Sequence, residues 1–313
     1  MNIKLFANMH NHSTHSDGVY TPRELVEIAK KEGFGAMAVT DHDTVTGNAP
    51  LAEACAEAGL DCLFGAEFTS PSDFSKNFYH ICGYSFDPTY PEMAEYLRRM
   101  SFNETNQTKK LFDRGLEIGY LHDITWQDVL DDNPGVSWIC NEPVFRSLKK
   151  RGLAKDTDYP EFFAKVYGPY RATVPNVYPF LPADELIDLV RRAGGFMVLA
   201  HPHGQLCDLK KLCERGLRGV EVWHSMLTAD ERREALTAAG VLGLYVSGGE
   251  DHEGLCGGQY SRYGNPKESP FYFDPMTLGT TEYFFREMQS GKTVKKDDAE
   301  RRGIFGELLS LDV

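Results

Sequence analysis

Short apolar runs along the chain alternate with segments in which apolar residues recur at helical spacing. The runs have the length and the β-branched and aromatic content of strands. We predict seven strands from them, at Lys4–His10, Ala36–His42, Cys62–Thr69, Phe78–Tyr84, Phe196–His201, Val220–His224 and Leu244–Glu250. Strands that alternate with helices in this way predict a parallel sheet with the helices packed outside it.

The segments between these strands carry signals for the start of a helix. Thr21 precedes Pro22, and Glu24 follows three residues after Thr21. This is the pattern of a capping box with proline at the first helical position. Two further helices are predicted at Ala183–Arg192 and Thr228–Ala239, each followed closely by a glycine.

Seven strand–helix units predict an α/β fold, a distorted seven-stranded (β/α) barrel of the TIM-like kind. A doubly wound parallel sheet is the alternative architecture. That alternative would be favoured by a Gly-x-Gly-x-x-Gly turn after the first strand, and the sequence has none there. The barrel is therefore the prediction.

One connection is too long for this pattern, because residues 85–181 separate the fourth strand from the next helix. Ordinary connections are about 4–6 residues long. The stretch contains several helix-like segments, so we predict a helical insertion at 85–181, a substrate lid, on a metal-binding barrel of residues 1–84 and 182–313. The insertion has 12 Lys and Arg against 14 Asp and Glu, whereas the rest has 21 against 32. The nearly neutral insertion is therefore the better place to hold an anionic substrate.

Composition excludes several classes of protein. The 313 residues carry a formal net charge of −13, which argues against general binding to nucleic acid or to a membrane surface. The sequence contains no run of about 18 apolar residues, so no transmembrane helix is expected. The first residues also lack the features of a signal peptide. The seven cysteines form no Cys-x-x-Cys pair. We therefore expect a cytoplasmic protein without a disulfide framework.

Histidines and carboxylates gather where the predicted strands end. The histidines are His10, His12, His42, His80, His201 and His252, and the carboxylates are Asp17, Asp41, Asp43, Glu67, Glu250 and Asp251. The carboxyl ends of barrel strands share one face, which carries the active site. Imidazole and carboxylate bind zinc, manganese and iron, so we predict a multinuclear metal site. His80 fits least well, because it lies early in its strand, and alone it would be interpreted as a core residue.

These residues also resemble the motifs of a known family, the PHP (polymerase and histidinol phosphatase) phosphoesterases. The similar runs are Met9-His10-Asn11-His12-Ser13-Thr14-His15-Ser16-Asp17-Gly18, Thr40-Asp41-His42-Asp43, Gly65-Ala66-Glu67, Leu199-Ala200-His201-Pro202 and Ser247-Gly248-Gly249-Glu250-Asp251-His252. The helical insertion resembles the branch that includes nucleotide and nucleoside-bisphosphate phosphatases.

The resemblance implies two or three divalent transition metal ions, namely manganese, iron or zinc. It implies one position held by His10, His12, Glu67 and a carboxylate of the last motif, a second held by Glu67, His80 and His201, and a third held by Asp17, His42 and His252. Glu250 stands where the family usually has aspartate. Either its strand end retracts to accommodate the longer side chain, or Asp251 substitutes for it.

The predicted function is metal-dependent hydrolysis of a small phosphorylated metabolite, such as a nucleotide, nucleoside bisphosphate, sugar phosphate or cyclic phosphate. A metal-bridging hydroxide would attack phosphorus. Candidates for binding the substrate are Arg146, Lys149, Lys150, Arg171 and Arg262, and candidates for the proton donor are His203 and His224. An amidohydrolase-type metal hydrolase and a non-catalytic metal-binding accessory module remain as alternatives.

Two departures from the family pattern leave the substrate open. The branch often has His-Pro-Gly-Arg, with the arginine meeting phosphate, but this chain has His201-Pro202-His203-Gly204-Gln205. Asn141-Glu142 occurs where an arginine would be expected in the insertion. No stable nucleic-acid complex and no membrane partner are expected.

Overall fold

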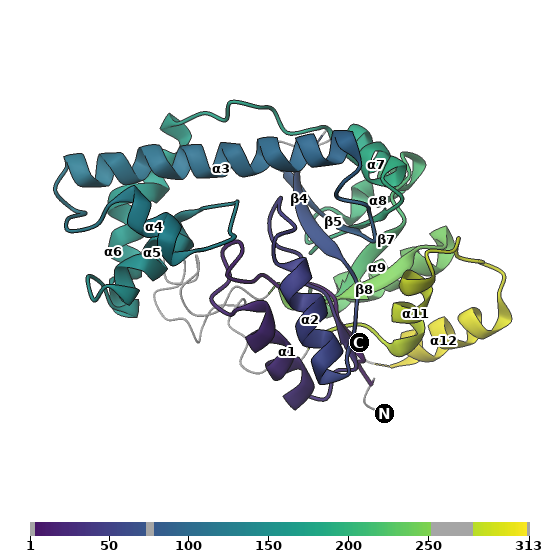
Figure 1. The fold of residues 1–313 in the computed structure, drawn as a ribbon. Coiled ribbons are helices and arrows are strands. Elements are labelled where there is room, and N and C mark those ends of the chain that lie inside the picture. Colours follow the sequence, from purple (N-terminus) through teal and green to yellow (C-terminus); the bar gives the residue numbers. More distant parts are fainter. Residues whose placement is uncertain (1–3, 73–77, 252–277, 312–313) are drawn as a thin grey trace.

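The computed structural model describes residues 4–72, 78–251 and 278–311, and these form a mixed α/β fold with two sheets (Figure 1). The smaller sheet is parallel and has the order β1 (Ala7–Asn8), β2 (Ala36–Met37), β3 (Asp61–Cys62). The larger sheet has the order β4 (Gly65–Pro71), β5 (Phe78–Tyr84), β6 (Phe196–Leu199), β7 (Gly219–Trp223), β8 (Tyr245–Gly248).

The prediction that all strands are parallel is wrong for one strand. β5 runs antiparallel to both β4 and β6, with Thr69 opposite His80 and Leu199 opposite Ile81. Only six residues separate β4 from β5 in the sequence. A parallel crossover needs a dozen or more residues, whereas a short connection allows a hairpin-like return. The reversal places the start of β5 beside the carboxyl ends of its neighbours.

The predicted third strand, Cys62–Thr69, is divided between the two sheets, so the described strands do not count as one seven-stranded sheet. Backbone hydrogen bonds nevertheless join the sheets at both edges. Glu67 N donates to Thr40 O at 3.2 Å, beyond the end of β2. Met9 N donates to Gly248 O at 3.0 Å, beyond the end of β1. The segments that follow β1 and β2 therefore lie beside β8 and β4, respectively.

The helices that cover the sheets include the three predicted there by position, which are α1 (Pro22–Lys31), α7 (Ala183–Arg192) and α9 (Ala229–Leu242). The others among the described residues are α2 (Asn48–Ala58), α8 (Leu209–Glu214), α11 (Glu282–Ser290) and α12 (Ala299–Ser310). The capping box that begins α1 is confirmed, because Thr21 Oγ1 accepts from Glu24 N and the Glu24 carboxylate accepts from Thr21 N. Apolar faces of α1 and α2 pack on the smaller sheet, and those of α7 and α9 pack on the larger one.

The segment between β5 and α7 is helical where it has regular structure. It contains α3 (Pro91–Glu117), α4 (Trp126–Asp132), α5 (Asn141–Lys150), α6 (Tyr159–Phe162) and short helical turns at Asp156–Asp158, Phe163–Tyr167 and Gly168–Thr173. Its far part has an apolar core of its own, including Phe112, Val144, Phe145 and Phe162. These observations favour the predicted insertion, whose bounds at 85–181 stay a prediction.

The insertion leaves β5 at the end of the sheet opposite to the histidines. Tyr84 pairs with Phe196 at the first residue of β6, so the chain leaves at the opposite end of the sheet. Helix α3 then carries it back, because 27 residues of helix span about 40 Å. Figure 1 shows α3 running from beside the strands to α4, α5 and α6. Among the described residues, no helix combines the length and the apolar character needed to span a bilayer.

Candidate metal centre

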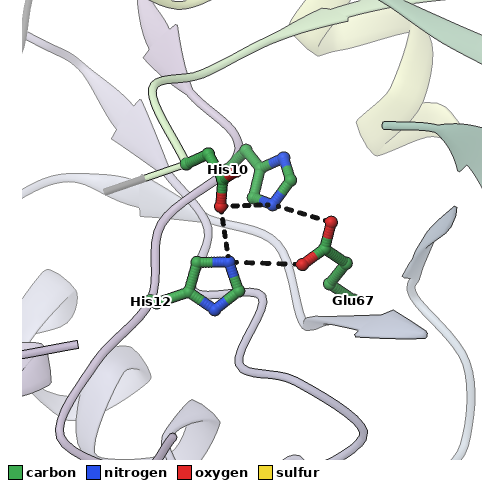
Figure 2. Close-up of side chains that lie close together, drawn as sticks. His10, His12 and Glu67 are labelled. Atoms are coloured by element: carbon green, nitrogen blue, oxygen red, sulfur yellow. Dashed lines mark ion pairs between the residues drawn. The ribbon is translucent and has the colours of Figure 1, made fainter. Parts of the chain in front are cut away.

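Glu67, on β4, lies at the centre of the histidine cluster and is fully buried. Its Oε1 lies 3.0 Å from His201 Nε2, 3.2 Å from His80 Nδ1 and 3.3 Å from His10 Nε2. Its Oε2 lies 3.1 Å from His42 Nδ1 and 3.3 Å from His12 Nε2. Figure 2 shows His10 and His12 on one side of this carboxylate. One carboxylate therefore faces five imidazole rings, which come from separate segments of the chain.

The antiparallel direction of β5 explains how His80 joins this cluster. His80 is the third residue of β5 and lies opposite Thr69 near the end of β4. In a parallel strand the same position would lie far from the carboxyl ends. His80 fitted the predicted site poorly because it lies early in its strand. Since that strand is antiparallel, the same early position brings His80 to Glu67.

Asp251, and not Glu250, reaches the first pair of histidines. Asp251 Oδ1 lies 2.8 Å from His12 Nε2 and 3.5 Å from His10 Nε2. The Glu250 carboxylate instead accepts from Asn8 Nδ2 at 2.9 Å and from Leu278 N at 2.6 Å. The expectation that Glu250 faces the metal is therefore corrected, because its side chain is turned into these backbone and amide contacts. Asp251 has a φ of 56°, a left-handed backbone that is costly outside glycine and often found at functional sites.

Asp17 joins the cluster from the loop after β1. Its Oδ1 lies 3.4 Å from His12 Nδ1, and its Oδ2 lies 3.4 Å from His42 Nε2. These three residues form a group whose ligand atoms all lie within 4.8 Å of one another. His252, the other ligand implied at this position, lies outside the described residues.

The donor atoms fit divalent metals. Two ligand atoms about 2.1 Å from a tetrahedral metal are roughly 3.4 Å apart, and most distances in the cluster lie near that value. Within the described parts of the chain, His10 Nε2, His12 Nε2, Glu67 Oε2 and Asp251 Oδ1 are buried and make no hydrogen bond. Buried polar atoms are rarely left unsatisfied. A cation among them would satisfy all four.

The buried carboxylates and imidazoles of the cluster shift one another's pKa values. Burial lowers the pKa of His42, but Asp17 and Glu67 raise it more, to about 9. Burial raises the pKa of Glu67, but His10, His80 and His42 lower it further, so that it lies well below its ordinary value. Without metal, protons on histidines whose pKa is raised, such as His10, His12 and His42, therefore offset charge on the buried carboxylates.

Glu221, on β7, was missed by the sequence interpretation. Its Oε1 lies 2.9 Å from His10 Nδ1, and its Oε2 accepts from His201 N at 2.6 Å. A carboxylate that accepts from one ring nitrogen orients the other nitrogen toward a metal. The available signal was a glutamate inside the apolar run Val220–Trp223, where an unpaired charge would be expensive.

The two predicted proton donors have different surroundings. His224 is fully buried beside the cluster, with its ring centroid 5.3 Å from that of His201. Its Nδ1 accepts from Met226 N at 3.2 Å, and its Nε2 lies 3.9 Å from Asp251 Oδ2. His203 is exposed instead and pairs with Glu231 near the start of α9, at 2.8 Å. The structure therefore brings His224, but not His203, to the cluster.

A cavity of about 940 Å³ lies between the metal cluster and the insertion. Asp17, His42 and His80 line it on one side, and Glu104, Glu142 and Arg171 are among the residues that line it on the other. The Arg171 guanidinium binds Glu104 with two hydrogen bonds, of 2.8 Å and 2.6 Å. Among the predicted cations, Arg171 is thus at the cavity, and Arg262 lies outside the described residues.

The structure does not bring three of the predicted substrate-binding cations, Arg146, Lys149 and Lys150, to this cavity. Arg146 donates to the backbone carbonyls of Thr14 and Gly18, both at 2.7 Å. Lys149 pairs with Asp156, and Lys150 pairs with Asp132 at 2.8 Å. None of the three belongs to the described lining of the cavity. Helical spacing placed them near one another but could not show that the helix turns them from the cavity.

Comparison with known proteins gives consistent relatives. Residues 8–122 match the family described as PHP domain. A 5'-3' exoribonuclease of Escherichia coli is 27% identical over 267 residues, which cover 82% of this chain and 87% of that protein. A 3',5'-nucleoside bisphosphate phosphatase of Chromobacterium violaceum is 27% identical over 256 residues, covering 78% of this chain and 86% of that protein. The crystal structure of a putative metal-dependent phosphoesterase from Bifidobacterium adolescentis has a TM-score of 0.69 and 27% identity, over 93% of this chain and 98% of that one.

Proposed function

We propose that this chain, a metal-dependent phosphoesterase with a PHP domain, hydrolyses a small phosphorylated metabolite held between the metal cluster and the insertion. The observation that carries the proposal is the placement of Asp17, His42 and His80 in the wall of one large cavity. A cavity of about 940 Å³ is of the size that encloses small molecules. The substrate would place its phosphoryl group at the cluster and the rest of the molecule under the insertion.

Three groups of residues would hold the metal ions. We assign His10, His12, Glu67 and Asp251 to one position, Glu67, His80 and His201 to a second, and Asp17 and His42, with His252 as a further candidate, to a third. Manganese, iron and zinc all suit imidazole with carboxylate. When bound, such ions lower the pKa of water and neutralise phosphoryl oxygens. Glu67 is common to the first two positions, since its carboxylate lies beside His10 and His12 of the first and beside His80 and His201 of the second.

The surrounding residues prepare this site before substrate arrives. Glu221 holds the His10 ring, and Asp41 holds the loop that carries Asp17. The Asp41 carboxylate accepts from Ser13 N at 2.7 Å and from Ser16 Oγ at 2.7 Å. Preorganised groups cost little reorganisation during the reaction. Arg171, which lines the far wall and is paired with Glu104, would contact the substrate beyond the reacting phosphoryl group.

We also interpret the two sheets as one distorted barrel with seven strand positions. Support comes from the hydrogen bonds between Glu67 and Thr40 and between Met9 and Gly248, which join the sheet edges. In this interpretation, residues 1–84 and 182–313 make the barrel, and 85–181 form a substrate lid. The barrel mouth and the lid then enclose the cavity between them.

A small substrate is favoured over a nucleic acid, because the chain has a net charge of −13 and its cavity is lined by several carboxylates. A nucleic-acid substrate normally needs a basic surface. The exoribonuclease among the relatives makes RNA an outcome that the test must include. An amide substrate is the other outcome to be included.

The test is a panel of substrates with protein loaded with manganese. It should contain nucleoside monophosphates and bisphosphates, sugar phosphates, cyclic phosphates, a 5'-phosphorylated oligoribonucleotide and simple amides. We expect phosphate release from small esters, and its loss in Glu67→Gln. Faster hydrolysis of the oligoribonucleotide or of an amide than of every small ester would reject the proposal.

A further inference from the structure

Glu142, in the first turn of α5, is a buried acid in the wall of the substrate cavity. Its side chain is only 6% exposed, yet it lines the cavity together with Asp17 and His42. No lysine or arginine among the described residues forms an ion pair with it. Buried carboxylates normally have such a partner or become neutral. The metal centre proposed above does not use Glu142.

The loop that precedes α5 is fixed on the metal side of the cavity. The Trp138 ring lies 5.6 Å from the His42 ring, measured between centroids. Ser137 Oγ lies 3.2 Å from Thr44 Oγ1, two residues beyond His42. These contacts hold the start of α5 against the segment that carries His42. Glu142, which lines the same cavity as His42, therefore has a fixed position relative to the metal-bearing wall.

The two oxygens of Glu142 have different surroundings. Oε1 accepts from Asn141 Nδ2 at 2.6 Å and from the Tyr159 hydroxyl. Oε2 has a weaker neighbour, the Cys140 thiol at 3.0 Å. Because the strong donors occupy Oε1, Oε1 is the carbonyl oxygen of the protonated carboxyl group. Oε2 is then the oxygen that can carry a proton.

Burial and one neighbouring negative charge favour the protonated form of Glu142. Burial, and to a smaller extent the charge of Asp17, raise the pKa of Glu142 to about 7. The hydrogen bonds from Cys140 and Tyr159 act in the opposite direction, as they favour the carboxylate. The other titratable or charged groups near it are Glu104 and Arg171, which are paired with each other, and Tyr167. Glu142 is thus an acid in the cavity lining that makes no ion pair with a lysine or arginine of the described residues.

We propose that Glu142 is the catalytic acid that protonates the leaving group, an assignment that rests on the proposed phosphoesterase function. A water oxygen forms the new bond to phosphorus while the bond between phosphorus and the leaving oxygen breaks. The electron pair of that bond stays on the leaving oxygen, which takes the proton from Glu142 Oε2. The product is an alcohol plus phosphate, and solvent returns a proton to the carboxylate.

The alternatives for this role are less well placed. His203 is exposed and paired with Glu231. His224 is buried behind Asp251 and is not among the described residues that line the cavity. The Arg171 guanidinium remains charged at any ordinary pH and cannot serve as an acid. Glu142 combines contact with the cavity and a proton that it can give up.

The test compares two esters of similar size whose leaving groups differ in their need for a proton. Benzyl phosphate releases a basic alkoxide, whereas p-nitrophenyl phosphate releases a phenolate that is stable at neutral pH. For Glu142→Gln, we expect kcat/KM to fall by about 100-fold or more on benzyl phosphate, the size of a lost general acid. The loss on p-nitrophenyl phosphate should be under about 10-fold, because that step gains little from an acid.

Two further variants make the result specific. Glu142→Asp retains an acid and should recover part of the activity on benzyl phosphate. Glu161→Gln makes the same chemical change at an exposed position of α6 and should behave as the unmodified protein. Metal content is measured for each variant. In the unmodified protein, activity on benzyl phosphate should also fall at alkaline pH, and this fall should be absent in Glu142→Gln.

The outcomes separate this assignment from the function on which it rests. Equal losses on the two esters, with metal content retained, would overturn the role of Glu142 and leave the phosphoesterase function intact. Poor folding of both Glu142 variants, shown by lost cooperative unfolding, would assign Glu142 to structure and also overturn the role. No turnover of either ester by the metal-loaded unmodified protein would overturn both proposals.

Discussion

The His10 ring and the Glu221 carboxylate are fully buried partners, with Nδ1 and Oε1 separated by 2.9 Å. When Nδ1 carries the proton, it donates a hydrogen bond to Glu221, and the lone pair of Nε2 then points toward Glu67 and Asp251. The ring has the tautomer and orientation that a metal ligand needs. Glu221 also accepts from the backbone N of His201, so one acid positions two segments of the cluster.

The first prediction is that Glu221→Gln weakens metal binding without removing a ligand. We expect the dissociation constant for manganese to rise about 10- to 100-fold, as is typical when such an orienting partner is changed. Titration calorimetry with manganese measures this effect. Glu214→Gln, at an exposed position of α8, is the matched control. An unchanged affinity in Glu221→Gln would mean that His10 is held without this carboxylate.

The second prediction distinguishes the neighbouring acids Asp251 and Glu250. Asp251→Asn removes the charge of a proposed metal ligand. Metal affinity should therefore fall more than the ~10- to 100-fold that is typical when a residue that only orients a ligand is changed. Glu250→Gln should retain metal but destabilise the fold by about 1–3 kcal/mol, because a buried acceptor is lost. Metal analysis after dialysis and denaturant unfolding measure the two effects. The reverse pattern would return Glu250 to the position of metal ligand.

The third prediction is that metal affinity rises with pH. The metal-free His42 has a pKa of about 9, so it carries a proton at neutral pH that a metal must displace. Protons therefore compete with the metal below that pKa, and the competition weakens as the pH rises toward it. We expect roughly a tenfold gain in affinity per pH unit for each proton displaced.

Calorimetry in buffers with different ionisation enthalpies counts these protons directly. His122→Ala changes a histidine in the exposed part of the insertion and should leave the count unchanged. Proton release near zero at neutral pH would contradict the buried, protonated state of the metal-free cluster.

The fourth prediction concerns Arg146, which now has a structural role. Arg146→Ala loses two hydrogen bonds to the carbonyls of Thr14 and Gly18, so unfolding free energy should fall by about 1–3 kcal/mol. Lys150→Ala loses an ion pair of an exposed lysine with Asp132, which keeps Arg151 as a partner, and should cost about 0–1 kcal/mol. Activity of Arg146→Ala on different esters should change by one common factor. A selective loss on one phosphorylated metabolite would place Arg146 at the substrate after all.

The sequence predicted most strand and helix positions and much of the cluster, because hydrophobic period and residue type are local properties. It assigned Glu67 and the histidines at positions 10, 12, 42, 80 and 201 to a common location before any geometry was known, whereas His252 lies outside the described residues. The direction of β5 was not predicted, because apolar spacing is the same for parallel and antiparallel strands. His80 therefore had no explanation until the short connection from β4 was taken into account.

The remaining errors concern the direction in which a side chain points. Glu250 and Asp251 are adjacent acids, and only the backbone conformation after β8 decides which one faces His12. Arg146 lies at helical spacing from two lysines, but the rotation of α5 turns it toward the loop after β1. Glu221 looked like an interior strand residue, since its partner His10 lies 211 positions away in the sequence. Such pairings depend on the whole fold.

The most direct test of the account is the rate of phosphate release as chelated protein is titrated with manganese. The account predicts no release from the metal-free protein, and a rate that rises until more than one equivalent has bound. Glu67→Gln, which changes the central carboxylate of the cluster, should stay inactive throughout the titration. Undiminished phosphate release from the metal-free protein, or saturation of binding below one equivalent, would contradict a multinuclear metal-dependent phosphoesterase.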